Sequence, residues 1–405
     1  MLLGLGAALP LAACAKNAAT KALPSDDWTR IRADFELEPD VINLDNGWTC
    51  TPPRAVYDAF VEHTRAINRL PARRLATMGA ELLEPKVHPQ LAHLLGVPPV
   101  ELALVRNTTE AIGTVLLGYP FAPGDELVCT SQDYFHMLDM VAARGRQGVT
   151  VRRIDLPIPA TSADAIVDAY AKAITPKTKL VLVTHVSNRT GQVMPVARIA
   201  DVAHKAGAEV VVDAAQSFAI LDHRVPDLHA DYYCTSLHKW LASPVAAGAL
   251  WMKAEHATKI PPRFGGFRPP AFPMAAYMEF GTVNFAEFVA AGAAIDYHLH
   301  VGAQRKEARV RELVRQLRIG LAKIAGIKFY TVDEPWASCG LLVFELPGKK
   351  PGDVQKQLWE RHKVLVQAQA PEDVPTIRGV RVSPAIYNTT SETDRAVDAI
   401  RAVAQ

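Results

Sequence analysis

Short apolar runs alternate with helical patterns from about residue 100 to residue 255, and this alternation constrains the fold more than any other feature. A strand-then-helix rhythm predicts a mostly parallel sheet with helices on both faces, so we expect an α/β protein. The expected strands are 102–106, 126–130, 149–154, 179–185, 208–213, 231–235 and 247–252, and the expected helices are 53–70, 108–117, 134–146, 163–174 and 196–206.

The length of 405 residues exceeds what one ordinary core supports, so we expect two domains. A helical pattern over 285–321, with a break around Gly302, leads from the sheet to a smaller α+β unit. The expected strands of that unit are 327–332, 338–346, 363–367 and 379–383, before a helix over 391–404. The expected divisions are a signal or linker over 1–24, an arm over 25–45 that packs on the small domain, a large domain over 46–295 and a small C-terminal domain over 296–405.

The first residues predict export. Met1–Ala13 is apolar, rich in small residues and too short to span a bilayer, and Leu11–Cys14 has the form of a lipoprotein cleavage box. No Lys or Arg precedes Lys16, so we expect the coding start to lie further upstream. We therefore expect a periplasmic or exported protein, carried by the twin-arginine route or anchored by a lipid on Cys14. If the segment is not a signal, the expected location is the cytoplasm.

Composition narrows the classes of partner. The formal net charge is only +2 and no basic run occurs, which argues against a nucleic-acid partner. The five cysteines are scattered without a C-x-x-C pair, so neither a metal site nor a disulfide framework is expected.

Two polar groups at strand ends carry the strongest indication of chemistry. Lys239 lies in a short turn after the expected strand 231–235, and Asp213 ends the apolar run 208–213, with Gln216 three residues on. A Schiff-base lysine and an acid that holds a pyridinium nitrogen are what pyridoxal phosphate (PLP) requires from a protein. Taken alone, a lysine in a turn is ordinarily a solvated surface charge. The residues at the other strand ends therefore decide whether Lys239 belongs to a cofactor site.

Several further strand ends carry polar or aromatic residues. Thr108 and Thr109 open a helix and form an anion site, although Thr108 also suits a plain helix cap. Tyr134 follows the strand 126–130, where it either stacks on a flat ring or belongs to the core. Asn188 lies in a turn with spare donors, as in a plain loop or a cofactor contact.

The remaining candidates would bind anions. Ser236 and His238 precede the turn lysine and can donate hydrogen bonds to a phosphate, and Thr282 in a later loop is a further donor. Arg381 alternates with apolar residues of the expected strand 379–383. It is either an exposed edge charge or a fork for a carboxylate.

Taken in chain order, these segments resemble the class-V aminotransferase family of fold-type I PLP enzymes, from about residue 44 to residue 395. The resemblance implies that Lys239 links to PLP, that Asp213 pairs with the ring nitrogen and that Gln216 contacts the 3-oxygen. It also implies a homodimer with shared active sites. The other implied roles are Tyr134 as ring stacker, Thr108, Thr109, Asn188, Ser236 and His238 as cofactor contacts, Thr282 as a phosphate ligand from the second subunit, Arg381 as the binder of the substrate α-carboxylate, and Asn46 and Trp48 as neighbours of the substrate.

Two departures from the cysteine desulfurase pattern indicate which branch of the family this chain resembles. Cysteine desulfurases carry a nucleophilic cysteine in the loop before the arginine, and the equivalent stretch 366–371 here has none. Desulfurases have histidine at the ring-stacking position, and Tyr134 is closer to the isopenicillin N epimerase-like branch. The chain is also similar to the exported PLP enzyme that tailors the siderophore pyoverdine.

The expected substrate is a primary amine, most simply an amino acid or a peptide-linked one. Transamination or a related deaminating side-chain conversion is the first expectation, epimerisation the second, and C–S or other β- or γ-elimination the third. A PLP-fold protein without activity is disfavoured because Lys239, Asp213 and Arg381 are all present. A nucleotide-binding α/β protein is set aside because no G-x-G-x-x-G follows the first strand.

Overall fold

A computed structural model describes residues 27–266, 269, 271–279 and 281–405 of the chain. The predicted export segment 1–24, including Cys14, lies outside the described residues. Within the described part, no helix has the length and apolar character needed to cross a bilayer.

The larger sheet confirms the predicted α/β class. Its seven strands run in the order β2-β8-β7-β6-β5-β3-β4, and only β8 is antiparallel to its neighbours. Each predicted strand is present to within two residues. The bounds are β2 Leu102–Val105, β3 Glu126–Thr130, β4 Thr150–Ile154, β5 Thr178–Thr184, β6 Glu209–Asp213, β7 Tyr232–Ser236 and β8 Gly248–Met252.

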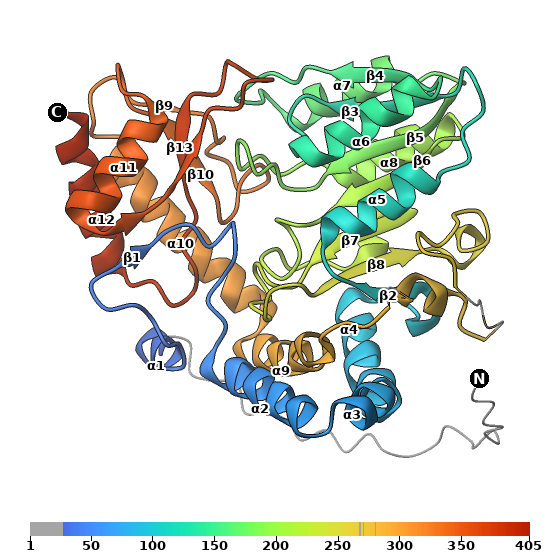
Figure 1. Cartoon of the computed structure of the whole chain (residues 1–405). Helices are drawn as coiled ribbons and strands as arrows, with labels where there is room; N and C mark the ends of the chain where they lie inside the picture. Colours follow the sequence, from blue (N-terminus) through green and yellow to red (C-terminus); the bar gives the residue numbers. More distant parts are fainter. Residues whose placement is uncertain (1–26, 267–268, 270, 280) are drawn as a thin grey trace.

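Helices cover both faces of this sheet because its strands are apolar on both sides (Figure 1). Along β5, Leu180 and Leu182 belong to one core, whereas Val181 and Val183 belong to the core on the opposite face. This alternation follows from the two-residue period of a strand. The helices α5 Thr108–Gly118 and α6 Phe135–Arg146 pack together over the first core, and α7 Ala163–Ala173 and α8 Val196–Lys205 pack together over the second.

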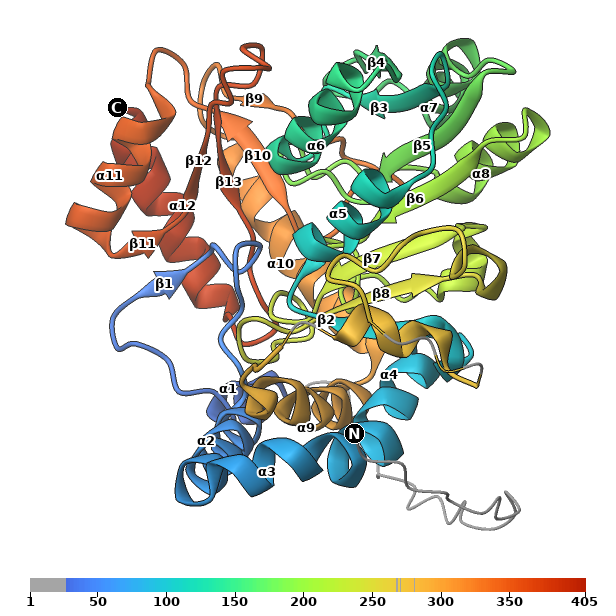
Figure 2. The same ribbon diagram turned by 45° about the vertical axis from the view of Figure 1, so that its right-hand side comes forward.

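A helical layer lies beside the sheet and contains elements that the sequence did not predict. The predicted helix α2 Arg54–Arg69 packs along α9 Phe285–Val301, as both views show (Figures 1 and 2). Between α2 and the sheet the chain continues as helix almost without a break, and Pro85 lies inside the widened π-helical stretch. The unpredicted elements are α3 Pro71–Met78, η1 Gly79–Val87 and α4 His88–Leu95, and the short helix α1 Trp28–Ala33 precedes this layer.

The smaller C-terminal unit has an antiparallel sheet in the order β12-β13-β10-β9. The helical pattern over 285–321 breaks at Gly302 as predicted, and that glycine has a positive φ of 90°. The predicted strand 363–367 is wrong as one element, because β11 pairs in parallel with β1 whereas β12 joins the antiparallel sheet. The bounds are β1 Ile42–Asn43, α10 Ala303–Leu321, β9 Lys328–Phe329, β10 Leu342–Glu345, α11 Pro351–His362, β11 Val364–Leu365, β12 Gln367–Gln369, β13 Gly379–Val382 and α12 Thr390–Ala404.

Candidate active site

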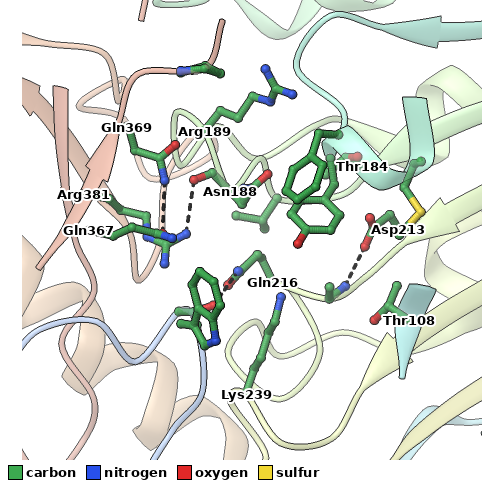
Figure 3. A pocket seen from close by; sticks show the side chains of 18 of the residues that line it. Thr108, Thr184, Asn188, Arg189, Asp213, Gln216, Lys239, Gln367, Gln369 and Arg381 are labelled. Carbon is green, nitrogen blue, oxygen red and sulfur yellow. Dashed lines mark hydrogen bonds between the residues drawn. The ribbon is translucent and has the colours of Figure 1, made fainter. Parts of the chain in front are cut away.

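A pocket of about 550 Å³ lies where the carboxyl ends of the parallel strands face β12 and β13 of the smaller sheet (Figure 3). Parallel sheets collect ligands at this edge because the loops that follow the strands converge there. The pocket brings together most of the predicted residues. They are Trp48, Thr108, Thr109, Tyr134, Asn188, Asp213, Gln216, Ser236, His238, Lys239 and Arg381.

Lys239 follows β7 in a turn and points into the pocket (Figure 3). Burial lowers its pKa to about 8, and the positive charge of Arg381 acts in the same direction against the opposing pull of Asp213. Its Nζ makes no hydrogen bond to the described residues. The structure therefore excludes the fully solvated surface lysine and leaves a partly buried amine that loses its proton more easily than an exposed one.

Asp213 ends β6 at the base of the same pocket. One carboxylate oxygen accepts a hydrogen bond from the Ala215 N–H at 2.9 Å. Burial raises the pKa of Asp213, and its hydrogen bond and the charge of Lys239 only partly oppose that effect. An acid this short of partners suits a cationic ring N–H placed against it.

The start of α5 and the end of β7 form the anion-binding end of the pocket. Asn107 caps the helix by accepting from the Glu110 N–H, so the cap role considered for Thr108 belongs to its neighbour. The Ser236 hydroxyl lies 2.7 Å from the Thr108 hydroxyl and accepts from the Thr108 N–H at 2.9 Å. Hydroxyls at a helix N-terminus suit a phosphate.

His238 lies beside this end. Its Nδ1 is buried without a hydrogen-bond partner, and burial together with Lys239 lowers its pKa to about 4. The imidazole is therefore neutral at neutral pH and keeps a ring nitrogen for a ligand.

Asn188 and Gln216 differ in how many of their side-chain hydrogen-bonding groups are already occupied by the protein. The Asn188 side-chain oxygen is buried without a partner, so it has capacity for a ligand. Gln216 is committed on both sides, since it donates to the Gly47 carbonyl at 2.7 Å and accepts from Trp240 at 3.0 Å. Its second N–H is what remains for the predicted 3-oxygen contact.

Tyr134 lines the pocket between the charged groups. Burial raises its pKa, and Asp213 raises it further while Arg381 opposes the shift. Its ring lies 4.4 Å from that of Phe135, which also lines the pocket and is 48% exposed. The aromatic pair thus belongs to the pocket wall as well as to the edge of the core.

Arg381 is fully buried on β13, which excludes the exposed edge charge. Its Nη2 donates to Asp45 at 2.7 Å and its Nη1 lies 3.4 Å from the Asn188 carbonyl. Nε is buried without a partner, so the guanidinium keeps an unused donor that a carboxylate could satisfy. The role of Asp45 was missed, although it lies next to Asn46 in the segment that the resemblance covered.

Two predicted residues do not line the pocket. The Asn46 amide donates to the carbonyls of Asn43 and Ser383, so it fastens the segment that carries Trp48. Thr282 is exposed and lies outside the pocket of its own chain.

The sequence did not predict that the segment after β11 forms one wall of the pocket. Gln367 and Gln369 point from β12 to the pocket and are hydrogen-bonded to each other at 3.2 Å (Figure 3). Arg189 forms a bidentate ion pair with Asp373 at 2.8 and 3.1 Å, which ties this loop to the larger sheet. Nothing in the sequence pattern links residues 184 positions apart.

No thiol lines the pocket among the described residues. The four described cysteines are buried, and burial raises the pKa of Cys50 and Cys339 to about 12. Thiols held in this state are poor nucleophiles.

The free groups of the pocket fit PLP. A lysine without a hydrogen bond, an under-partnered buried acid and a hydroxyl-lined helix terminus match the aldehyde carbon, the ring nitrogen and the phosphate of that cofactor. The unpartnered atoms of His238 and Asn188 belong to residues that line the same pocket. Each of these groups costs folding free energy until a ligand satisfies it.

Comparisons with known proteins agree with this fit. The family model described as aminotransferase class-V matches residues 42–396. Isopenicillin N epimerase from Amycolatopsis lactamdurans is 31% identical over 404 residues, which covers 92% of this chain and 98% of that protein. Cysteine desulfurase from Enterobacter sp. (strain 638) is 30% identical, with 92% of this chain and 97% of that protein covered.

Solved structures show the same fold. The apo cysteine desulfurase from Thermococcus onnurineus NA1 matches with a TM-score of 0.82 at 26% identity, covering 93% of this chain and 97% of that chain. A mutant of C-DES with glycine linked to its PLP cofactor matches with a TM-score of 0.81 at 21% identity, covering 91% and 98%, which shows the fold alone. From the family match and the fit of the pocket to its cofactor, the chain belongs to the class-V aminotransferase family of PLP-dependent enzymes.

Proposed function

We propose that the protein removes or transfers the amino group of an α-amino acid, either free or linked to a peptide. The observation that carries the proposal is the placement of a proton-accepting amine and a carboxylate-binding arginine in one pocket, with no thiol beside them among the described residues. Lys239 lines the pocket with its amine free of hydrogen bonds, and Arg381 on the smaller sheet keeps an unpartnered Nε donor.

PLP, when bound, supplies an electron sink for negative charge that develops on the substrate α-carbon. The residues of this chain supply the rest. Lys239, whose pKa is lowered to about 8, holds a larger deprotonated fraction near neutral pH than an exposed lysine and accepts the α-proton at Nζ. Asp213 supplies the carboxyl group that would face the ring nitrogen of the cofactor, and Arg381 orients the substrate through the substrate carboxylate.

The absence of a thiol from the described pocket argues against the desulfurase reaction, in which a cysteine accepts sulfur. The loop that would carry it holds Gln367, Ala368 and Gln369 instead. Elimination of other β- or γ-substituents needs no thiol, so it remains the third candidate.

Epimerisation is the second candidate because of Tyr134. An epimerase needs a second proton carrier on the face of the substrate opposite to the lysine. The Tyr134 hydroxyl lines the pocket, makes no hydrogen bond within the described residues and stays protonated because its pKa is raised. The likeness to isopenicillin N epimerase over 92% of this chain supports the same candidate.

The test is to incubate the PLP-loaded protein in deuterated water with a panel of L-amino acids and γ-linked glutamyl peptides, with and without a 2-oxo acid acceptor. A 2-oxo product and a newly aminated acceptor support the proposal. A deuterated D-product with the amine retained supports epimerisation and contradicts transfer. Release of a side-chain fragment together with ammonia supports elimination. The Lys239→Ala variant, which should form none of these products, is the negative control for each assay.

We also propose that the enzyme is an exported homodimer. The support for a dimer is that Thr282, expected from the resemblance to bind phosphate, is exposed and does not line the pocket of its own chain. The support for export is the apolar segment Met1–Ala13. Sedimentation analysis of the wild type tests the first, and fractionation of cells that produce the full chain tests the second.

A further inference from the structure

A second buried lysine lies behind the active-site turn. Lys306 on α10 is only 7% exposed, and burial lowers its pKa to about 8. α10 passes between the large sheet and the small domain (Figure 1). No carboxylate of the described residues forms an ion pair with Lys306, although buried ammonium groups are ordinarily paired.

The surroundings of Lys306 are otherwise uncharged. It lines a small cavity with Cys50 and His298. Burial raises the pKa of the Cys50 thiol to about 12 and, together with Lys306, lowers the pKa of His298 to about 3, so both neighbours are neutral at neutral pH. The cavity holds about 20 Å³, which is too small for a substrate. The ammonium group of Lys306 therefore has a structural role within the protein and does not bind a second ligand.

The hydrogen bond that Lys306 makes is to the active-site turn. Its Nζ donates to the carbonyl of Trp240, the residue directly after Lys239. The two preceding carbonyls are held as well. The His238 carbonyl accepts from the Cys50 N–H at 3.1 Å, and the Lys239 carbonyl accepts from the Ala242 N–H at 3.1 Å.

This turn is strained, which explains why it needs external support. Ala242 has a φ of 59°, in the left-handed region that a residue with a β-carbon adopts only at a cost. A charge-assisted hydrogen bond is about twice as strong as a neutral one, and it reaches the turn from a different element. Removing it frees the Trp240 carbonyl, although the Cys50 N–H still holds the His238 carbonyl and Gln216 still holds the Trp240 indole.

We propose that Lys306 is a positioning residue, which holds the Trp240 carbonyl and thereby fixes the backbone from which Lys239 projects into the pocket. The proposal rests on the assignment of PLP to Lys239 and not on which reaction follows. It assigns to α10 a direct part in the geometry of the active site.

The test compares Lys306→Met with Arg309→Met. Arg309 is a matched control because it lies one turn further on α10, is 6% exposed and donates to a backbone carbonyl, that of Asn388, outside the pocket. Both variants lose a buried cation and are expected to melt at a lower temperature. Purified proteins stripped of cofactor are mixed with PLP, and the linkage to Lys239 is trapped with borohydride at increasing times.

We expect Lys306→Met to slow trapping at Lys239 by about tenfold, since the lost bond is charge-assisted, and Arg309→Met to trap at the wild-type rate. Lys306→Gln keeps an N–H donor without the charge and is expected to recover part of the rate. It also serves if the methionine variant does not fold. Wild-type trapping kinetics in both Lys306 variants, with only a lower melting temperature, would overturn the proposal. A wild type that is not modified at Lys239 at all would overturn the cofactor assignment with it.

Discussion

The strand β6 carries an acidic residue at each end, and the two ends have opposite electrostatics. Glu209 at the amino end accepts hydrogen bonds from the Tyr232 hydroxyl at 2.7 Å and the Lys259 ammonium at 2.5 Å. Asp213 at the carboxyl end accepts one hydrogen bond from its own turn and faces a lysine that makes none. The same strand therefore supports a satisfied ion network at one end and an unsatisfied one at the other.

The neighbouring Asp231 completes the amino-end network. Its carboxylate pairs with Lys253 and His204 and also accepts from the Val210 N–H at 2.7 Å. His256, whose Nε2 lies 3.6 Å from the same carboxylate, acts first among the partners that hold the pKa of Asp231 well below its usual range, although Asp231 is buried. Burial raises the pKa of Asp213 instead, because its partners are too few to offset it.

The difference shows which end of the sheet is built for a ligand. A folded chain can satisfy buried charges with its own groups, as it does around Asp231. At the carboxyl end it leaves Asp213, Lys239 and the Arg381 Nε without sufficient partners. Stability is reduced there so that the charges remain for cofactor and substrate.

Among the substitutions that test this difference between the two ends of the sheet, Lys239→Ala should have the largest effect on turnover. Turnover should fall at least about 10³-fold because both the cofactor linkage and the proton acceptor are lost. The free energy of unfolding of the cofactor-free protein should not fall, since no hydrogen bond is removed with the buried amine. Steady-state kinetics and urea titration measure the two quantities.

Lys253→Ala is the matched control for that substitution, because it removes a lysine from the amino-end network. It should lower stability and leave turnover near the wild-type value. Turnover retained in the Lys239 variant would contradict the assignment of that end as the active site.

Asp213→Asn should have the next largest effect. The change removes the negative charge that faces the cofactor ring, and we expect turnover to fall about 10²–10³-fold, as when one preorganised electrostatic group is lost. The cofactor-free variant should be at least as stable as the wild type, because the buried charge has only one hydrogen-bond partner. A variant with full activity, or one that is strongly destabilised, would show that Asp213 is an ordinary structural acid.

Asp231→Asn should produce the reverse pattern. We expect a loss of roughly 1.5–3 kcal/mol in the free energy of unfolding, the range for hydrogen bonds to charged groups. The lower end applies because Lys253 and His204 are each about one-third exposed, so solvent screens them. Turnover of the PLP-loaded variant should stay within about twofold of wild type at a temperature where it is folded. A large loss of turnover without a loss of stability would mean that the two ends are coupled.

The smallest expected effect is a difference in pH dependence between the two acids. The pKa of Asp231 is lowered on folding, so its stabilising contribution is present above the unfolded value near ~3.9 and is lost as the pH falls below it. The pKa of Asp213 is raised on folding, so its unfavourable contribution grows as the pH rises above the same value.

Urea titrations of the cofactor-free protein between acidic and neutral pH measure this difference. The stability deficit of Asp231→Asn relative to wild type should shrink toward acid pH. The stability of Asp213→Asn relative to wild type should instead increase toward neutral pH, because only the wild type then holds an unfavourably buried charge. If the stability of both variants relative to wild type changed with pH in the same direction, the proposed difference between Asp213 and Asp231 would be refuted.

The sequence was sufficient for the parts of the fold and site that local pattern determines. The strands of the large sheet and the break at Gly302 follow from apolar periodicity and from glycine chemistry, and the structure confirms them. The acid could be singled out because it ends an apolar run, and the lysine because it lies in the short turn after the next expected strand. The helices over 71–95 were missed because Pro85 interrupts the pattern, and packing of that stretch against α9 maintains the helix.

Long-range partners could not be predicted in the same way. The pairing of Asp45 with Arg381 joins residues 336 positions apart. The split of 363–367 into two strands depends on which partner each half meets, namely β1 for one and β13 for the other. The second buried lysine, Lys306, lies in a helix of mixed charge whose pattern reads as solvated.

The most direct test of the account is to find which lysine binds PLP. The protein is incubated with PLP, reduced with borohydride and digested, and the modified peptide is identified by mass spectrometry. The account predicts one modified site, Lys239, with Lys306 unmodified although burial lowers the pKa of both amines to about 8. Modification of Lys306 or of surface lysines, with Lys239 left intact, would contradict it.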